Sequence, residues 1–139
     1  MDQADIFRFD LPGKYKYLNI VGAALEAIIQ HMDDLATPAA TIYNVQLAVH
    51  EICNNIIEHA YGHEEGQIKL VFCLEYASRR FVVDLYDTGR VFDLSTVPEL
   101  NLAEPQEEGY GLFLVRQLMD EVIYEPQLEN NHWRLVKNL

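Results

Sequence analysis

Basic residues are scarce in this chain of 139 residues, and long apolar runs are absent from it. Ten lysines and arginines stand against 22 aspartates and glutamates, giving a net charge of −12. Nucleic-acid binding rests on clustered Lys and Arg, so this balance argues against a nucleic-acid partner. It favours a basic protein surface, although plain solubility would explain the charge equally well. No apolar run reaches the length of a membrane span, so we expect no membrane segment.

Cysteine is scarce, and no export signal is evident at the start of the sequence. The acidic start MDQADIFRFD has no apolar core, so we expect no export signal. The two cysteines, Cys53 and Cys73, fall within segments of regular apolar spacing. Buried reduced thiols are the expectation, and a cytoplasmic location agrees with them.

Several familiar catalytic motifs are missing. The chain has no G-x-x-x-x-G-K-[ST] loop and no G-x-G-x-x-G turn after a strand. The pair His50-Glu51 resembles the start of a zinc-hydrolase helix, but Asn54 stands where that motif needs a second histidine. These absences exclude the P-loop, dinucleotide-binding and zinc-hydrolase patterns.

Apolar spacing predicts the order β-α-α-β-β-α-β-β in a single domain over residues 1–139. The fold class expected is α+β: a two-layer sandwich of a mixed, mostly antiparallel sheet with helices on one face. The predicted strands cover 6–11, 67–76, 80–86, 121–124 and 133–136; the predicted helices cover 15–35, 37–61 and 111–119.

One helical stretch, AVHEICNNIIEHAYG, carries polar residues at a spacing of four. Glu51, Asn55 and His59 would therefore form one stripe along the helix. A carboxylate can act as a general base and an amide oxygen can ligate a hard cation. An ordinary polar stripe on a half-exposed helix is the alternative, but the apolar flanks look buried, and polar groups among buried neighbours need partners.

Two glycine-bearing turns accompany this helix. Asp87-x-Gly89 ends a predicted strand, where the carboxylate could accept a hydrogen bond from the amino group of adenine, or could simply form a turn. Gly109-x-Gly111 precedes the third helix, where backbone N–H groups could surround phosphates, or could only give the helix a flexible entry.

Taken together and in this order, these motifs resemble those of the GHKL ATPases, whose members include gyrase, heat-shock chaperone, histidine kinase and mismatch-repair domains. Within that group, Phe92-Asp93 and the run GLFLVRQLMDEV are similar to bacterial anti-sigma factor serine kinases. The resemblance implies a Bergerat-type fold, binding of ATP and Mg²⁺, phosphorylation of a serine on a small antagonist protein, sequestration of a sigma factor and a possible homodimer.

The resemblance also implies a role for each motif residue. Glu51 would be the general base, Asn55 would hold Mg²⁺, and Asp87 would read adenine. The remaining nucleotide contacts would come from His59, Gly89, Gly109, Gly111 and Leu112.

The segment 94–108 departs from the resemblance because it is strongly acidic. It holds four glutamates, including Glu107 and Glu108 just before the glycine turn, and no lysine or arginine. Related kinases commonly carry a basic residue at that place. If the segment forms a lid over the triphosphate, its carboxylates should repel the nucleotide. The sequence therefore leaves open an alternative, a nucleotide-binding interaction module with little or no phosphotransfer. A detached histidine-kinase domain is a third possibility.

Overall fold

The computed structural model describes residues 3–31, 39–62, 66–92, 110–127 and 130–139. Gly109 and the acidic segment 94–108 lie outside these residues. The elements, in chain order, are β1 (Ala4–Pro12), a 3₁₀ turn (Tyr15–Tyr17), α1 (Leu18–Gln30), α2 (Ala39–Asn55), a π-helix η2 (Ile56–Ala60), β2 (Gln67–Glu75), β3 (Arg80–Asp87), α3 (Tyr110–Leu118), β4 (Glu121–Pro126) and β5 (Asn131–Asn138).

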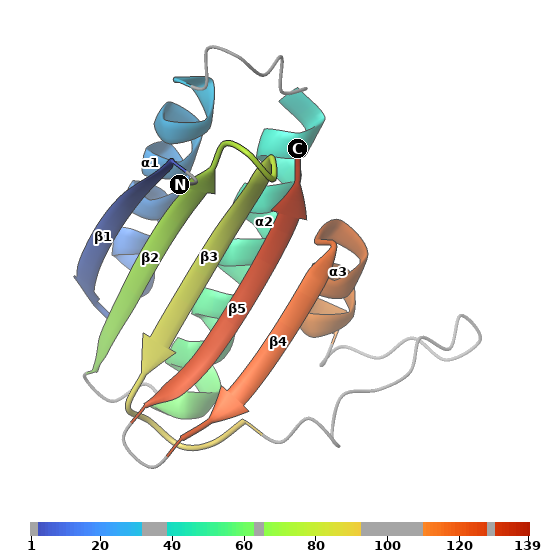
Figure 1. The fold of residues 1–139 in the computed structure, drawn as a ribbon. Coiled ribbons are helices and arrows are strands. Elements are labelled where there is room, and N and C mark those ends of the chain that lie inside the picture. The colour runs from blue at the N-terminus through green and yellow to red at the C-terminus, as the bar shows by residue number, and fades with distance from the viewer. Residues whose placement is uncertain (1–2, 32–38, 63–65, 93–109, 128–129) are drawn as a thin grey trace.

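The five strands form one sheet in the order β1-β2-β3-β5-β4, with α1, α2 and α3 on one of its faces (Figure 1). This confirms the predicted α+β sandwich and the order of its elements. All four strand pairings are antiparallel. The described sheet is therefore fully antiparallel, and the expectation of a mixed sheet was wrong. The local reason is that β2–β3 and β4–β5 are hairpins, and neighbouring hairpins join through the antiparallel pair β3–β5.

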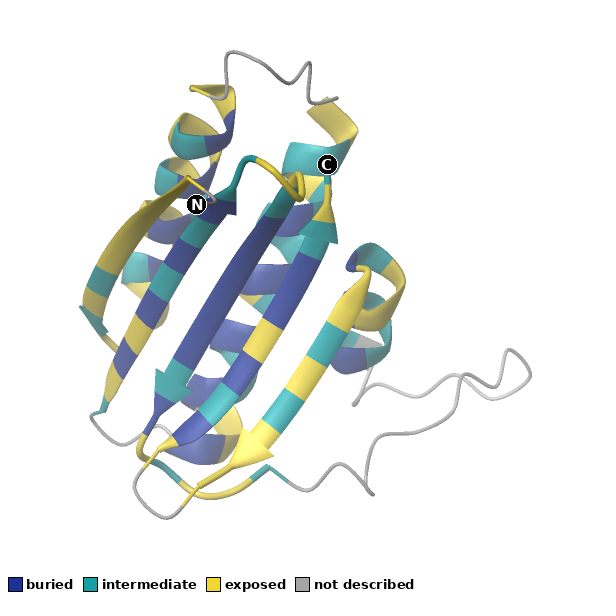
Figure 2. Ribbon diagram, viewed as in Figure 1, coloured by how far each residue is buried: buried dark blue, intermediate teal, exposed yellow. Residues whose placement is uncertain are grey.

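The core lies between the sheet and the helices (Figure 2). Alternation along each strand sends every second side chain toward the helices. Phe81, Val83 and Leu85 of β3 point there and are fully buried. They meet a helix face that includes Val49 and Ile52 of α2. Burying a side chain of this size stabilises the fold by roughly 1.5–3 kcal/mol.

The second helix changes from α-helical to π-helical geometry directly after Asn55, within the predicted polar stripe. An α-helix was expected as far as Tyr61, but α2 ends at Asn55 and continues as the π-helix η2. The backbone N–H of Tyr61 donates to Ile56 O at 3.1 Å, a bond five residues long. Asn54 and Asn55 have low helix propensity, which weakens the α-helical register at this point. Gly62 then takes a left-handed φ of 57° and ends the helix, as expected.

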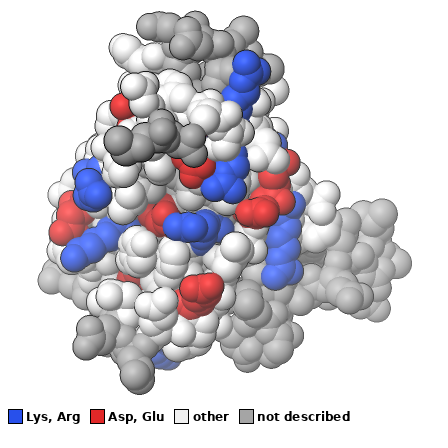
Figure 3. Space-filling model, in the orientation of Figure 1, with Lys and Arg blue, Asp and Glu red and all other residues white. Residues whose placement is uncertain are grey.

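The other sheet face carries interspersed charges of both signs (Figure 3). Asp84 of β3 lies there and is nevertheless buried, because Arg134 and His132 of β5 cover it. Cys73 of β2 also lies on this face and is only half-buried, whereas Cys53 in α2 is buried as expected. In the described part of the chain, no helix combines the length and apolarity needed to span a bilayer.

Candidate functional site

The packing of α2 against α3 brings the first and last predicted motifs together. Glu51 and Asn55 of α2 face Gly111 in the first turn of α3. A Cβ atom at Gly111 would lie 2.7 Å from Glu51 Oε2 and 3.9 Å from Asn55 Oδ1. Gly111 thus leaves the space that the Glu51 carboxylate uses, and any side chain there would push that carboxylate aside. The candidate base, the candidate metal ligand and Gly111 border one space.

Asp87 closes the site at the end of β3. Its side chain is almost fully buried, with 2% of the residue exposed. Its Oδ1 accepts hydrogen bonds from the backbone N–H of Gly89 and from Nδ2 of Asn131, both at 2.9 Å. Burial raises the pKa of Asp87, and these two hydrogen bonds oppose the rise. The carboxylate is therefore held by neutral donors, and its second oxygen has no hydrogen bond among the described residues.

Gly89 has a packing role that the sequence did not indicate. A Cβ atom at this position would lie 2.3 Å from the backbone oxygen of Ala60, at the end of η2. The next residue, Arg90, donates its backbone N–H to the same oxygen at 2.7 Å. The turn after β3 is thereby joined to the end of the π-helix, and only glycine permits this close approach.

Three aromatic side chains, which we call the aromatic wall, stand beside Asp87. They are Phe92, Tyr124 of β4 and Trp133 of β5. The ring centroids of Tyr124 and Trp133 are 4.3 Å apart, and those of Phe92 and Trp133 are 5.6 Å apart. Tyr124 Oη accepts the backbone N–H of Phe92 at 2.7 Å. The wall encloses a hollow of about 10 Å³, whose other lining residues are Asn55, Ile56, Ala60, Asp87 and Arg90.

The other predicted site residues are His59, Leu112 and Gly109, and the contacts of the described ones do not point as clearly to a ligand. His59 lies within the π-helix η2. Its ring centroid is 5.7 Å from that of Phe92, and its Nε2 is 3.9 Å from Glu58 Oε2. The side chain of Leu112 is buried in the core, with 2% of the residue exposed. Leu112 can therefore reach a ligand only through its backbone. Gly109 falls outside the described residues.

Asn55 is the predicted metal ligand on this helix. The described residues contain no cluster of three His, Cys, Asp or Glu side chains that could hold a metal ion. Mg²⁺ is commonly held by one or two protein oxygens together with substrate phosphates and water. The Asn55 side-chain oxygen as a single protein ligand suits an ion that arrives with a nucleotide, rather than an ion held by the protein alone.

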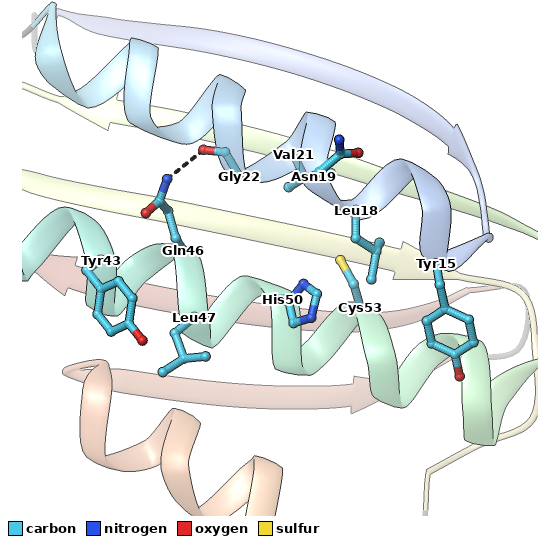
Figure 4. Close-up of a pocket in the computed structure, with 10 residues that line it drawn as sticks. All are labelled: Tyr15, Leu18, Asn19, Val21, Gly22, Tyr43, Gln46, Leu47, His50 and Cys53. Atoms are coloured by element: carbon cyan, nitrogen blue, oxygen red, sulfur yellow. Dashed lines mark hydrogen bonds between the residues drawn. The ribbon is translucent and has the colours of Figure 1, made fainter.

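A second cavity, of about 360 Å³, lies behind this helix, between α1 and α2. Its lining includes Leu18 and Val21 of α1 and His50 and Cys53 of α2, and Gln46 Nε2 donates to Gly22 O across the two helices at 2.8 Å (Figure 4). His50 and Glu51 are neighbours in sequence but lie on different sides of α2. The larger cavity is thus separate from the candidate site.

The sequence alone did not predict four of the residues that lie at the candidate site: Phe92, Tyr124, Asn131 and Trp133. Their contribution depends on strand register: Asp87 pairs with Asn131, and Tyr124 pairs with Trp133. Alternation along residues 131–136 could have assigned Trp133 to the helix-covered face. It could not have shown that β5 lies beside β3.

Residues 13–137 match the histidine kinase-like ATPase domain family. The chain belongs to this family. Membership confirms the resemblance drawn from the motifs and implies nucleotide binding. The chain is also 28% identical, over 134 residues, to proteins named serine-protein kinase RsbW from Bacillus cereus and Bacillus anthracis. The alignments cover 88% of this chain and 78% of those relatives.

Two solved structures support the fold. The first holds RsbU and RsbW domains of a Mycobacterium tuberculosis protein, with a TM-score of 0.70 and 16% identity, and covers 97% of this chain. The second is the histidine kinase domain of a blue-light-activated histidine kinase from Erythrobacter litoralis, with a TM-score of 0.59, 21% identity and 93% coverage. This chain spans only 32% and 62% of those two chains, respectively.

Proposed function

We propose that this chain is an ATP-dependent protein serine kinase that phosphorylates a small antagonist protein and also sequesters a sigma factor. The observation that carries the proposal is the meeting of Glu51, Asn55 and Gly111 at one space, with Asp87 buried nearby on neutral donors. The similarity to serine-protein kinases named RsbW supports the same reading.

Each residue has a distinct part in this proposal. Asp87 accepts a hydrogen bond from the amino group of adenine, and Asn55 Oδ1 contributes one ligand to Mg²⁺. Glu51 accepts the proton of the substrate serine hydroxyl while the serine oxygen attacks the terminal phosphorus of ATP. The bond between that phosphorus and ADP breaks, and ADP leaves. Gly111 keeps the space beside Glu51 open. ATP, when bound, supplies the phosphoryl group.

A nucleotide-binding interaction module with little transfer activity is the second candidate. The acidic pair Glu107-Glu108 favours it, because carboxylates near a triphosphate repel it unless a cation intervenes. In the kinase proposal, a partner protein supplies that cation, much as an arginine finger acts in trans. Slow turnover by the isolated chain, increased by the partner, is the corresponding expectation.

Transfer of labelled phosphate from ATP to candidate antagonist proteins tests the kinase against the module. Glu51→Gln keeps the size of the side chain and removes the base, so transfer should fall by about 10²–10⁴-fold while ATP binding survives. Asn55→Ala should instead weaken binding in the presence of Mg²⁺. ATP binding without transfer to any antagonist would favour the module, and loss of binding in Glu51→Gln alone would show that the roles are misassigned.

We also propose a cytoplasmic location and a homodimer, both resting on the family resemblance. The sheet face of Figure 3 is the candidate dimer surface, since charges of both signs are interspersed on it although the chain as a whole has a net charge of −12. Sedimentation velocity at low and high salt tests the dimer, and a monomer at all concentrations and salts would exclude it.

A further inference from the structure

The hollow beside Asp87 is far smaller than the base that the proposed function requires it to hold. Its volume is about 10 Å³, which is near the minimum for one water molecule. Pockets for small-molecule ligands and cofactors usually measure about 300–1,000 Å³. Asp87 and Asn55 both border this hollow, so a base that reaches Asp87 through it must displace something that lines it.

Two members of the aromatic wall are fixed in place. Tyr124 and Trp133 are a directly opposed pair in the ladder between β4 and β5, and Trp133 is 2% exposed. Their ring centroids lie 4.3 Å apart, so each ring limits the movement of the other. Moving either ring would disturb the sheet.

Phe92 differs from these two in its attachment. It lies beyond β3, outside every strand and helix, and it is half-buried. Its ring has edge contacts with Trp133, Tyr124 and His59, at centroid distances of 5.6, 6.3 and 5.7 Å. Its backbone N–H is held by Tyr124 Oη at 2.7 Å. Of the three rings, Phe92 is the one that can move without disturbing the sheet.

We propose that Phe92 is an aromatic gate of the adenine site, held closed by the hydroxyl of Tyr124. Entry of the base displaces the Phe92 ring from the hollow, and the displaced ring packs against the base. Tyr124 is a positioning residue that sets how readily the gate opens. This inference rests on the proposed nucleotide-binding function of the same site.

Trp133 provides a direct reporter, because it is the only tryptophan in the chain and belongs to the aromatic wall. Mixing wild-type protein with ATP and Mg²⁺ in a stopped-flow instrument should change the Trp133 fluorescence. Phe92→Ala removes the gate, and Tyr124→Phe removes only the hydroxyl that holds it. Both variants should raise the association rate constant for ATP several-fold, and Phe92→Ala should also raise the dissociation rate constant.

Two matched variants control for the chemical change alone. Phe7→Ala makes the same truncation on β1, and Tyr43→Phe makes the same deletion at an exposed residue of α2. Neither should alter the rates. Phe92→Leu preserves most of the apolar volume and serves if Phe92→Ala is poorly folded; it too should bind faster than wild type.

The outcomes separate the gate from the proposed function. Calorimetric binding of ATP with unchanged rates in Phe92→Leu and Tyr124→Phe would overturn the gate and leave nucleotide binding intact. Binding without any change in Trp133 fluorescence would also overturn it, because the base would then not reach the wall. Absence of calorimetric ATP binding by the wild-type protein would overturn the proposed function, and the gate with it.

Discussion

Strand β3 carries two buried aspartates three residues apart, Asp84 and Asp87, which lie on opposite faces of the sheet and have different hydrogen-bond partners. Asp84, on the face without helices, is held by a guanidinium and an imidazole: Arg134 Nε lies 2.8 Å and His132 Nε2 lies 2.6 Å from its Oδ1. Asp87, on the helix-covered face, is held among the described residues by the amide groups of Gly89 and Asn131. The exposed fractions of the two residues, 6% and 2%, are similar.

In the proposed function, this difference in partners separates a structural carboxylate, Asp84, from one that is available to a ligand, Asp87. The Asp84 carboxylate is already paired with the Arg134 guanidinium, and this pair links β3 to β5. A buried carboxylate with neutral donors retains unmet capacity as an acceptor, at a cost in desolvation. Burial alone would have marked both residues as functional candidates. The chemistry of their partners separates them.

Asp87→Ala should give the largest functional effect of any change at these two positions. Removing the acceptor takes away a charge-assisted hydrogen bond to the base, so ATP affinity should fall by about a hundredfold. Asp84→Ala is the matched control and should leave the affinity within twofold. Isothermal titration calorimetry with ATP and Mg²⁺ measures both. Equal losses in the two variants would remove the distinction between the faces.

Asp84→Ala should give the larger loss of stability. It leaves the half-buried His132 and the partly exposed Arg134 without their shared carboxylate. We expect the free energy of unfolding to fall by about 1–3 kcal/mol, since Arg134 can still reach water. Urea denaturation measures this loss. A smaller loss in Asp84→Ala than in Asp87→Ala would contradict the structural role of Asp84.

A smaller effect concerns pH. The pKa of Asp87 is raised from its usual value of 3.8 by burial, so the folded state favours the protonated form. The stabilising effect of that proton is fully present below the unfolded pKa and is lost as the pH rises through the folded pKa. Asp87→Asn removes the charge and keeps an oxygen that can accept from Gly89 and Asn131.

The free energy of unfolding of wild type should therefore fall, relative to Asp87→Asn, as the pH rises from below 3.8 toward neutrality. Other titrating groups are common to both proteins and cancel in the difference. Urea denaturation over this pH range measures it. A rise in the relative stability of wild type over the same range would mean that ionised Asp87 is stabilised by its surroundings, contrary to the account.

Local patterns in the sequence were enough for much of the fold and part of the site. The four-residue spacing of Glu51 and Asn55 needed only a helix to place both side chains on one stripe, and the turn at Asp87 needed only the end of a strand. The meeting of Glu51 with Gly111 was beyond such patterns, because it depends on how α3 packs on α2. The π-turn after Asn55 was also not predicted, since its residues fit an α-helical pattern.

Strand order explains the other omissions. Asn131 reaches Asp87 because β5, and not β4, pairs with β3. Trp133 and Tyr124 meet through the register of the β4–β5 hairpin. Neither fact has a local signal, since the sequence shows the strands but not their neighbours. The pairing of Asp84 with Arg134 has the same origin.

Discrimination between ATP and GTP by the wild-type protein tests the central claim, that Asp87 is an acceptor kept for the amino group of adenine. Guanine presents a carbonyl oxygen at that place, which would face the carboxylate as a second acceptor. Calorimetric titration with each nucleotide and Mg²⁺ should show ATP binding on the order of a hundredfold or more tighter than GTP. Comparable dissociation constants for ATP and GTP would contradict the claim.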